Sequence, residues 1–309
     1  MTHSRPQSFF SLLLISLTIG FVGCNKSNEE PVSRAAKGEV PTAKRLGMIV
    51  SADELSDRLS DKNLLILDAR SQADYEKGHL PAAVHVDVNA WKTQALKETG
   101  KGLKDQQTWT TMVRQLGINN NSQVVVYAGA RPLSATRIWW TLRYLGVEDA
   151  SLLDGGWPAW KEIEADSSTV VPAVNKGNFD VDFQKNRSAP IDWVKENCKK
   201  DSIAMMDARS AEEFALHVPG ATRLEWSELL DDKGKLKPVA ELQKLFSQKG
   251  FANDKETVVY CKTGGRASLN VFALELAGYE KVRSYYPGWS LWGSDESTPK
   301  EKVKPKGKK

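Results

Sequence analysis

One cysteine of this chain lies where it could act as a nucleophile. Cys261 directly follows the apolar run 257–260 and opens a loop that consists of Lys262, Thr263, Gly264, Gly265 and Arg266. The backbone N–H groups of a glycine-rich turn, the start of a following helix and nearby cations all favour the thiolate, which is the reactive form of a cysteine. We therefore predict that Cys261 is the catalytic residue, that the loop after it binds the substrate, and that Lys262 and Arg266 attract an anion. A buried packing cysteine is the alternative, but that role needs neither glycines nor cations after it.

The surroundings of Cys261 occur a second time in the chain, without the cysteine. Four short motifs return in the same order at a spacing of roughly 130–140 residues, which indicates two domains rather than a short-period solenoid. They are Asp68-Ala69-Arg70 and Asp207-Ala208-Arg209, His79-Leu80-Pro81 and His217-Val218-Pro219, Val125-Val126-Tyr127 and Val258-Val259-Tyr260, and Gly156-Trp157 and Gly288-Trp289. Ala128 occupies the position of Cys261, so only the second repeat is predicted to be catalytic.

Each repeat alternates short apolar runs with segments of helical periodicity. The runs 64–67, 124–127, 203–206 and 257–260 have the length and composition of buried parallel strands. One helix is predicted from a capping box at Ser51 to about Leu59. Two more are predicted over 134–145 and 267–277, and a glycine follows each of these two. This alternation predicts an α/β fold with a central parallel sheet, in which ligands bind at the carboxyl ends of the strands. Cys261 lies at such an end.

Taken together, these motifs resemble the tandem rhodanese-domain sulfurtransferases of the thiosulfate or 3-mercaptopyruvate type. The resemblance covers about residues 46–293 and includes Gly-His-Leu-Pro-Ala-Ala at 78–83, which is similar to the family's Gly-His-Ile-Pro-Gly-Ala, as well as the helix 134–144 and the turn 152–157. It implies two tandem rhodanese-like domains, each with a central, mostly parallel sheet flanked by helices. The boundaries that we expect are an inactive domain over 46–165, a linker over 166–189 and a catalytic domain over 190–293.

The resemblance also implies a ping-pong reaction that needs no cofactor and no metal. Cys261 would take the sulfane sulfur of a donor such as thiosulfate as a persulfide and pass it to a thiophilic acceptor, which is cyanide or a thiol. Backbone N–H groups of the loop would stabilise the persulfide. Asp207 and Arg209 would brace the loop, because their copies occur in the inactive repeat too. For the same reason, His217 is expected to be a structural histidine rather than an acid–base catalyst.

Three departures from the family pattern bear on the donor. Many tandem members carry an arginine where this chain has Glu213, and the second repeat has no counterpart of Gly78. The loop Cys-Lys-Thr-Gly-Gly-Arg matches neither the thiosulfate nor the 3-mercaptopyruvate enzymes and is closer to the loops of bacterial and single-domain rhodaneses. We favour thiosulfate because two cations suit a small dianion, with 3-mercaptopyruvate as the alternative.

Two functions of other classes stay open. The rhodanese fold also resembles that of dual-specificity phosphatases, which use Cys-x5-Arg. Cys261 and Arg266 give Cys-x4-Arg, and the smaller loop suits a single sulfur atom better than a phosphate. The other alternative is a sulfane-sulfur carrier that holds a persulfide without turning over small acceptors, for which the cysteine-free repeat around Ala128 is a precedent within the chain.

Residues 1–24 have the pattern of an export signal. A charged start at Arg5 precedes the apolar run 9–22, which is too short for a membrane span of about 20 residues. The run ends in Gly23-Cys24 and resembles a bacterial lipobox, with Phe21 where leucine is usual, so Cys24 is the predicted lipidation site and 25–45 a flexible tether. We expect an exported protein, lipid-anchored on the periplasmic side of a bacterial membrane; an ordinary secretory signal is the alternative.

The composition limits the remaining partners. The net charge of +4 is modest and no basic patch with interleaved aromatic residues is found, so nucleic acid is not an expected partner. Six lysines fall within the last ten residues, and 294–309 is predicted to be a disordered tail.

Cys198 and Cys261 suggest neither a disulfide scaffold nor a zinc site, and Cys198 is expected to be a packing residue, with a resolving role as the alternative. Small sulfur donors and acceptors are the expected partners, and a monomer is the default, because tandem pairing already buries one face of each domain.

Overall fold

The computed structural model describes residues 46–98 and 103–303 of the chain. The predicted signal peptide 1–24, the tether 25–45 and residues 304–309 of the predicted tail lie outside the described residues. All described residues belong to one of the chain's two units, Ala43–Lys309. Within them, no helix is both long enough and apolar enough to cross a membrane.

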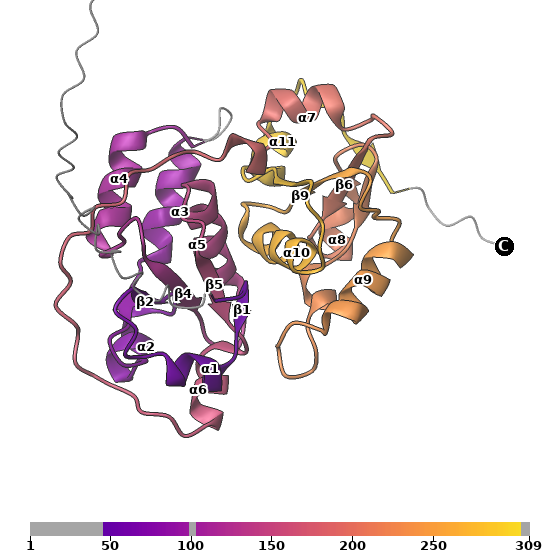
Figure 1. The fold of residues 1–309 in the computed structure, drawn as a ribbon. Helices are drawn as coiled ribbons and strands as arrows, with labels where there is room; N and C mark the ends of the chain where they lie inside the picture. Colours follow the sequence, from indigo (N-terminus) through magenta and orange to yellow (C-terminus); the bar gives the residue numbers. More distant parts are fainter. Residues whose placement is uncertain (1–45, 99–102, 304–309) are drawn as a thin grey trace, which may run out of the picture. The chain divides into compact units, whose positions relative to one another are not determined.

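The first repeat is built on a parallel sheet of five strands in the order β1, β5, β4, β2, β3 (Figure 1). The strands are β1 (Ile49–Val50), β2 (Leu64–Asp68), β3 (Val84–His85), β4 (Gln123–Tyr127) and β5 (Ala150–Leu153). The two strands predicted from the sequence, β2 and β4, are neighbours at the centre of the sheet. Every residue of β4 is buried, which explains its unbroken apolar run.

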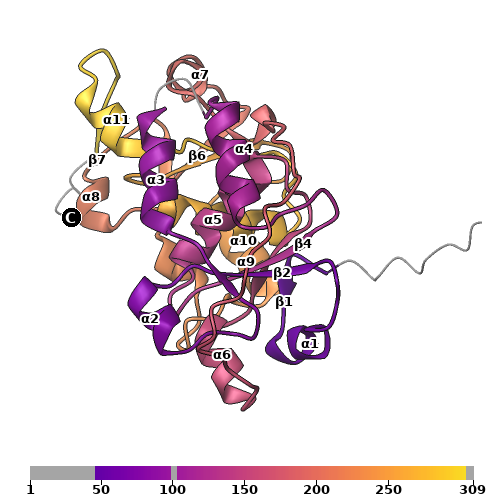
Figure 2. The ribbon, with the colours of Figure 1, turned by 90° about the vertical axis from the view of Figure 1, so that its left-hand side faces the viewer.

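Helices cover both faces of this sheet, with α3, α4 and α5 on one side and α1, α2 and α6 on the other (Figures 1 and 2). Successive residues of β4 serve the two faces: Val124 and Val126 pack with α3 to α5, whereas Val125 and Tyr127 pack with α1 and α6. The helices are α1 (Ala52–Asp57), α2 (Gln72–Lys77), α3 (Val88–Lys97), α4 (Gln106–Gln115), α5 (Leu133–Tyr144) and α6 (Gly156–Glu162). The predicted helix after Ser51 is α1, and it ends at Asp57, two residues before the expected end.

The second repeat has the same plan on a parallel sheet in the order β10, β9, β6, β8. Ser188 forms an isolated parallel bridge with Ser284 of β10, where the first repeat has β1. The strands are β6 (Ile203–Asp207), β7 (Leu216–His217), β8 (Ala221–Arg223), β9 (Glu256–Tyr260) and β10 (Val282–Ser284), and the helices are α7 (Ile191–Asn197), α8 (Ala211–Phe214), α9 (Val239–Gln248), α10 (Gly265–Leu276) and α11 (Gly288–Ser294). The described part also contains two 3₁₀ helices, η1 (Lys185–Arg187) and η2 (Trp226–Leu229).

The two repeats share one hydrophobic core, which continues through α5 and α10. The rings of Trp139 on α5 and Phe272 on α10 meet edge to face at 4.7 Å, and Trp140 stacks on Tyr286 at 4.9 Å. Offset-stacked and edge-to-face ring pairs stabilise such a contact beyond what the burial of their apolar surface contributes. The loop that precedes α10 is therefore held against the first repeat.

The prediction that residues 294–309 form a disordered tail is wrong for the part up to 303. β11 (Glu301–Lys302) pairs antiparallel with β7, and the buried Trp292 donates its indole N–H to the carbonyl of Pro299 at 2.8 Å. The first repeat ends in the same way: Trp160 donates to Asp166, and Ser168 bridges antiparallel to His79. Each repeat thus closes with a short return segment, and Lys302, one of the lysines that suggest disorder, lies on an exposed two-residue strand.

Glu301 holds the return segment of the second repeat. Its carboxylate accepts a hydrogen bond from the Gly220 N–H at 2.9 Å and lies 4.0 Å from the His217 ring. We predict that Glu301→Ala lowers the free energy of unfolding by about 0.5–1 kcal/mol, the net worth of one charge-assisted hydrogen bond on a partly exposed group. Thermal unfolding should shift down by roughly 1–3 °C. Lys302→Ala is the matched control, since the Lys302 side chain makes no ion pair with a described residue; an equal shift in both variants would contradict the assignment.

Candidate active site

The structure places Cys261 where the sequence predicts it, at the carboxyl end of β9 and before α10. The residue is 1% exposed, and Gly264 is the N-cap of α10. The first helical hydrogen bond of α10 runs from the Ser268 N–H to the Gly264 carbonyl. The N–H groups of Gly264, Gly265, Arg266 and Ala267 therefore have no intrahelical partner. Such a set of N–H groups stabilises negative charge, which a thiolate or a persulfide at Cys261 would supply.

The two glycines of the loop allow it to pack closely. Gly264 has a φ of +83°, and a Cβ there would come within 2.7 Å of the Tyr286 ring. A Cβ at Gly265 would lie 2.4 Å from the Arg137 guanidinium. Both neighbours are fixed by further contacts, so any larger residue would displace the loop.

Backbone hydrogen bonds from α11 also hold the first residues of the loop. The N–H of Trp289 donates to the Cys261 carbonyl at 2.7 Å, and the N–H of Ser290 donates to the Lys262 carbonyl at 3.0 Å. Gly288 makes this approach feasible, because a Cβ there would lie 2.3 Å from the Cys261 carbonyl oxygen. The first repeat has the same bond, from Trp157 to Ala128 at 2.8 Å. The repeated Gly-Trp motif is thus the support of the loop.

Asp207 and Arg209, the residues predicted to brace the loop, lie beneath this support. Both are fully buried, and Arg209 donates to both carboxylate oxygens at 2.6–2.9 Å and to the Leu216 carbonyl at 2.9 Å. Its guanidinium lies 4.5 Å from the Trp289 ring. Burial alone would lower the pKa of Arg209, but the hydrogen bonds and charge of Asp207 more than offset it, so the pKa is raised. Arg209 thereby stays charged and fixes the tryptophan that holds Cys261.

The first repeat contains the same brace. Arg70 binds Asp68, donates to the Gly78 carbonyl at 2.6 Å and lies 4.2 Å from the Trp157 ring. In the second repeat, the Leu216 carbonyl takes the place of the Gly78 carbonyl. The shorter segment before His217 therefore keeps the acceptor that the missing glycine would have supplied.

His217 is a structural residue in its geometry, as the sequence predicts. Its Nδ1 is 2.8 Å from the Phe214 carbonyl, and its ring stacks on that phenylalanine at 4.0 Å. His79 repeats both contacts with Tyr75, at 2.9 Å and 3.9 Å. Neither histidine is among the residues that line the cleft at Cys261.

Arg266 is engaged by Glu213, which the sequence reading did not foresee. Its two terminal nitrogens donate to the two carboxylate oxygens of Glu213 at 2.5 and 2.9 Å. The pKa of Arg266 is raised, first by this hydrogen bond and also by the nearby Cys261. Arg266, which the sequence predicts to attract the anionic donor, thus lines the cleft at Cys261 but is paired with Glu213, the residue that stands in the place of the family's arginine. Lys262 is exposed and has no ion pair among the described residues.

Cys261 opens to a cleft of about 360 Å³ whose opposite wall belongs to the first repeat. The second repeat contributes Cys261, Lys262, Thr263, Gly265 and Arg266, and the first repeat contributes Val88, Asn89, Lys92, Leu133, Ser134 and Arg137. Lys92 and Arg137 are cations that the sequence analysis missed. A signal for Arg137 was present: it is a charged residue within the apolar run of the helix that follows the inactive loop.

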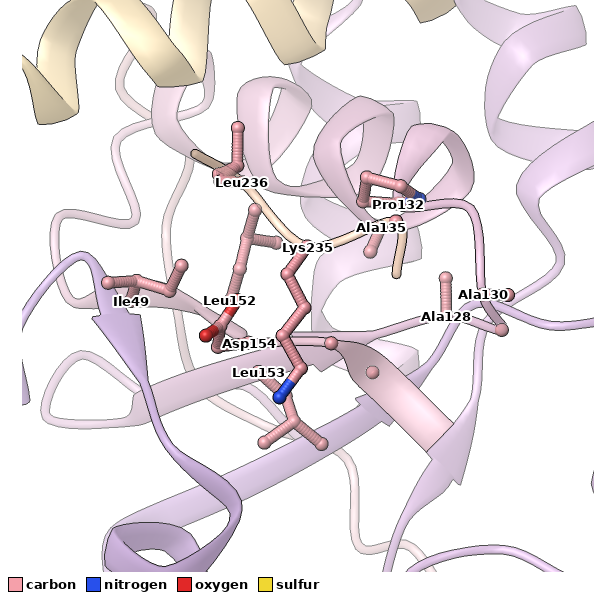
Figure 3. A pocket seen from close by; sticks show the side chains of 14 residues that line it. Ile49, Ala128, Ala130, Pro132, Ala135, Leu152, Leu153, Asp154, Lys235 and Leu236 are labelled. Carbon is pink, nitrogen blue, oxygen red and sulfur yellow. The ribbon is translucent and has the colours of Figure 1, made fainter. Parts of the chain in front are cut away.

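The corresponding site of the first repeat is closed. A cavity of about 20 Å³ lies beside Ala128, which is room for roughly one water molecule (Figure 3). Gly234 and Lys235, from a turn of the second repeat, form one wall, and the Lys235 side chain lies across the cavity above Leu153 and Asp154. Burial raises the pKa of Asp154, and the charge of Lys235 offsets part of that effect. This repeat therefore lacks both the nucleophile and the space for a donor.

Cys198 lies at the end of α7, where it is 4% exposed and packs with Val194, Met205 and Val218. Burial raises the pKa of its thiol, so it is a poor nucleophile. This environment agrees with the predicted packing role. In residues 46–98 and 103–303, no three His, Cys, Asp or Glu side chains gather in a way that could hold a metal ion.

The pair of Glu213 and Arg266 should give a defined pH dependence. The hydrogen bond from Arg266 lowers the pKa of Glu213, so the pair stabilises the fold above the unfolded-state pKa of about 4.3 and loses this effect as the pH falls through the folded-state pKa. We predict that Glu213→Gln lowers the free energy of unfolding by roughly 0.2–1 kcal/mol at pH 6–7, and that the two proteins converge toward pH 3. Urea unfolding between pH 3 and 7 measures this difference. A gap that stays constant over that range would show that the charge of Glu213 contributes nothing.

The chain matches one known protein family. The profile described as rhodanese-like domain matches twice, over residues 51–163 and 190–295. These two segments contain both sheets except for the edge strand β1, and all the α-helices described above.

Curated relatives and one solved structure agree with this match. A 3-mercaptopyruvate sulfurtransferase of Escherichia coli is 30% identical over 82% of this chain and 98% of its own, and a thiosulfate sulfurtransferase of Corynebacterium glutamicum is 31% identical over 82% and 90%. A sulfur carrier protein of Thermus thermophilus is 28% identical over 82% and 95%. The crystal structure of SseA from Escherichia coli, described as a 3-mercaptopyruvate sulfotransferase with the rhodanese fold, matches with a TM-score of 0.69 at 28% identity over 79% of this chain and 99% of that one.

Proposed function

The chain belongs to the rhodanese-like domain family, and from this premise we propose that it is a sulfurtransferase that carries sulfane sulfur as a persulfide on Cys261. The single observation that carries the proposal is the position of Cys261 at the start of α10, beside N–H groups that have no other partner. The matches to sulfurtransferases over 82% of the chain support it. The second repeat is the catalytic one, because Ala128 occupies the corresponding position in the first.

The reaction proceeds in two displacements. The Cys261 thiolate attacks the outer sulfur of the donor; with thiosulfate, the bond between the two sulfurs breaks and sulfite leaves with the electron pair. The persulfide that forms keeps its negative charge next to the loop N–H groups, which stabilise it without reorganisation. An acceptor nucleophile then attacks the terminal sulfur. Cyanide gives thiocyanate, a thiol gives a new persulfide, and the Cys261 thiolate is restored.

We propose thiosulfate as the donor. Because Arg266 is paired with Glu213, the support for a dianion comes from Lys262 together with Lys92 and Arg137, all of which line the cleft. The thiosulfate sulfurtransferase of Corynebacterium glutamicum is a relative of this type. The alternative donor is 3-mercaptopyruvate, which the Escherichia coli relative and the size of the cleft favour, since about 360 Å³ exceeds what thiosulfate requires.

A second candidate function is sulfur carriage without turnover of small acceptors. The relative from Thermus thermophilus is named a sulfur carrier protein. A carrier needs the same nucleophile and the same loop, so the two functions differ only in whether a small acceptor discharges the persulfide.

The first test is thiocyanate formation from thiosulfate and cyanide by the full chain in mild detergent. We expect turnover in the parent, loss by several orders of magnitude in Cys261→Ser, and retention in Cys198→Ala, because only Cys261 lies beside the loop N–H groups. The same assay with 3-mercaptopyruvate identifies the better donor. If mass spectrometry finds the persulfide on Cys261 but no thiocyanate forms, the protein is a carrier. If neither forms in folded, reduced protein, the sulfurtransferase proposal fails.

We also propose that the protein is exported and anchored by lipid at Cys24, on the periplasmic side of a bacterial membrane. The support is the sequence pattern alone: a charged start, the apolar run 9–22, and Gly23-Cys24 at its end.

The anchor has its own test in a bacterial host. Radiolabelled palmitate should be incorporated into the parent and not into Cys24→Ser, and the parent should fractionate with membranes. Recovery of an unlabelled protein that is cleaved elsewhere and free in the periplasm would instead establish an ordinary secretory signal.

A further inference from the structure

Arg137 is a buried cation without a carboxylate partner. The residue is 8% exposed, and none of the described carboxylates lies within 4.0 Å of its guanidinium. Both of its hydrogen bonds come from Nη1 and go to uncharged acceptors, the Thr263 carbonyl at 2.8 Å and the Tyr286 hydroxyl at 2.6 Å. A buried charge is costly unless it is balanced, so this arrangement points to an anion that is absent from the protein itself.

The unused donors of Arg137 lie next to the catalytic loop. A guanidinium has five N–H groups, and Nε and Nη2 of Arg137 have no hydrogen-bond acceptor in the described part of the chain. Nη2 is the atom that a Cβ on Gly265 would approach to 2.4 Å, which places it beside the first turn of α10. Arg137 also lines the cleft that contains Cys261. Its free donors and the free N–H groups of α10 are therefore available to the same small ligand.

A second cation of the first repeat lines the same cleft. Lys92 on α3 is half-buried and forms no ion pair with a described residue. Of the two cations of the catalytic loop, Arg266 is paired with Glu213, whereas Lys262 is exposed and forms no ion pair with a described residue. The first repeat thus supplies positive charge on the wall opposite the nucleophile, while Glu213 neutralises one of the two cations of the catalytic loop.

We propose that Arg137 and Lys92 form an anion subsite on the inactive repeat, which binds the charged end of the sulfur donor while its sulfur reaches Cys261. The chemistry recognised is a pair of anionic oxygens, either the sulfonate of thiosulfate or the carboxylate of a mercapto acid, because a guanidinium fork binds two such oxygens together. The identity of the ligand rests on the proposed sulfurtransferase function. The subsite itself acts on any small anion that reacts with Cys261.

Alkylation of Cys261 tests the subsite without sulfur transfer. Iodoacetate and iodoacetamide react by the same displacement, in which the sulfur attacks the CH₂ carbon and iodide leaves, and they differ in that only the first carries a carboxylate. Their rate ratio at Cys261, measured on the full chain by mass spectrometry of the Cys261 peptide, isolates the effect of the negative charge. Glutathione provides the ratio for a thiol without a subsite.

We expect the iodoacetate-to-iodoacetamide rate ratio to be higher at Cys261 of the parent than for glutathione. Arg137→Met should lower the iodoacetate-to-iodoacetamide ratio about tenfold and the more exposed Lys92→Ala about threefold, as removal of a nearby cation predicts. Arg137→Lys should retain part of the preference. The matched controls are Arg143→Met on the same helix, where the side chain bonds the Glu148 carbonyl, and Lys97→Ala at the exposed end of α3. Both should leave the ratio unchanged.

The possible results separate the proposals. An unchanged ratio in both Arg137→Met and Lys92→Ala overturns the subsite, and so does an equal loss of both rates in Arg137→Met with no effect of Lys92→Ala, because Arg137 would then only shape the loop. A changed ratio in a protein that forms no thiocyanate keeps the subsite and removes the sulfurtransferase proposal. In an active protein, the donor whose KM rises more in Lys92→Ala, thiosulfate or 3-mercaptopyruvate, identifies the anion that the subsite binds.

Discussion

The close contact of the catalytic loop with the first repeat is the constraint on which the rest of the site depends. Gly264 and Gly265 touch Tyr286 and Arg137 so closely that no side chain would fit at either position. Tyr286 belongs to the second repeat, but it is hydrogen-bonded to Arg137 and stacked on Trp140, so α5 holds the surface that shapes the loop. The direction of the N–H groups at the start of α10 therefore depends on the packing between the repeats. Cys261 belongs to one repeat, but its environment requires both.

Local patterns in the sequence were sufficient to predict the central strands and the position of Cys261 at the end of one of them. The strands β2, β4, β6 and β9 were predicted to within a residue at each end, because each is a short apolar run that both faces of a sheet bury. Cys261 and its glycines were found because their chemistry is local. The ion pair of Glu213 and Arg266 was not, since it joins residues 53 positions apart, and the contact of Arg137 with Thr263 spans 126 positions. Such contacts follow from topology rather than from spacing along the chain.

The return segment at 301–302 was missed for a different reason. A lysine-rich sequence is typical of a disordered tail, yet the order of this segment comes from backbone pairing with β7 and from the Trp292 indole, which composition does not report. The first repeat held the clue, because Trp160 and Asp166 make the same contact there. Repeats within one chain therefore predict each other's boundaries better than composition does.

The comparison of the two loops explains what an inactive repeat contributes. The first repeat keeps the Asp68–Arg70 brace and the bond from Trp157 to Ala128, so these features belong to the architecture of the repeat and not to catalysis. What distinguishes the second repeat is the cysteine, the glycine at its helix N-cap and an open cleft, whereas the first has Ala128, Pro132 at the N-cap and Lys235 across its cavity. Each repeat thus forms a wall of the other's pocket, closed in one case and open in the other. Because Glu213 pairs with Arg266, the cations of the cleft that form no ion pair with a described residue are Lys262 of the second repeat and Lys92 and Arg137 of the first, so both repeats supply positive charge beside Cys261.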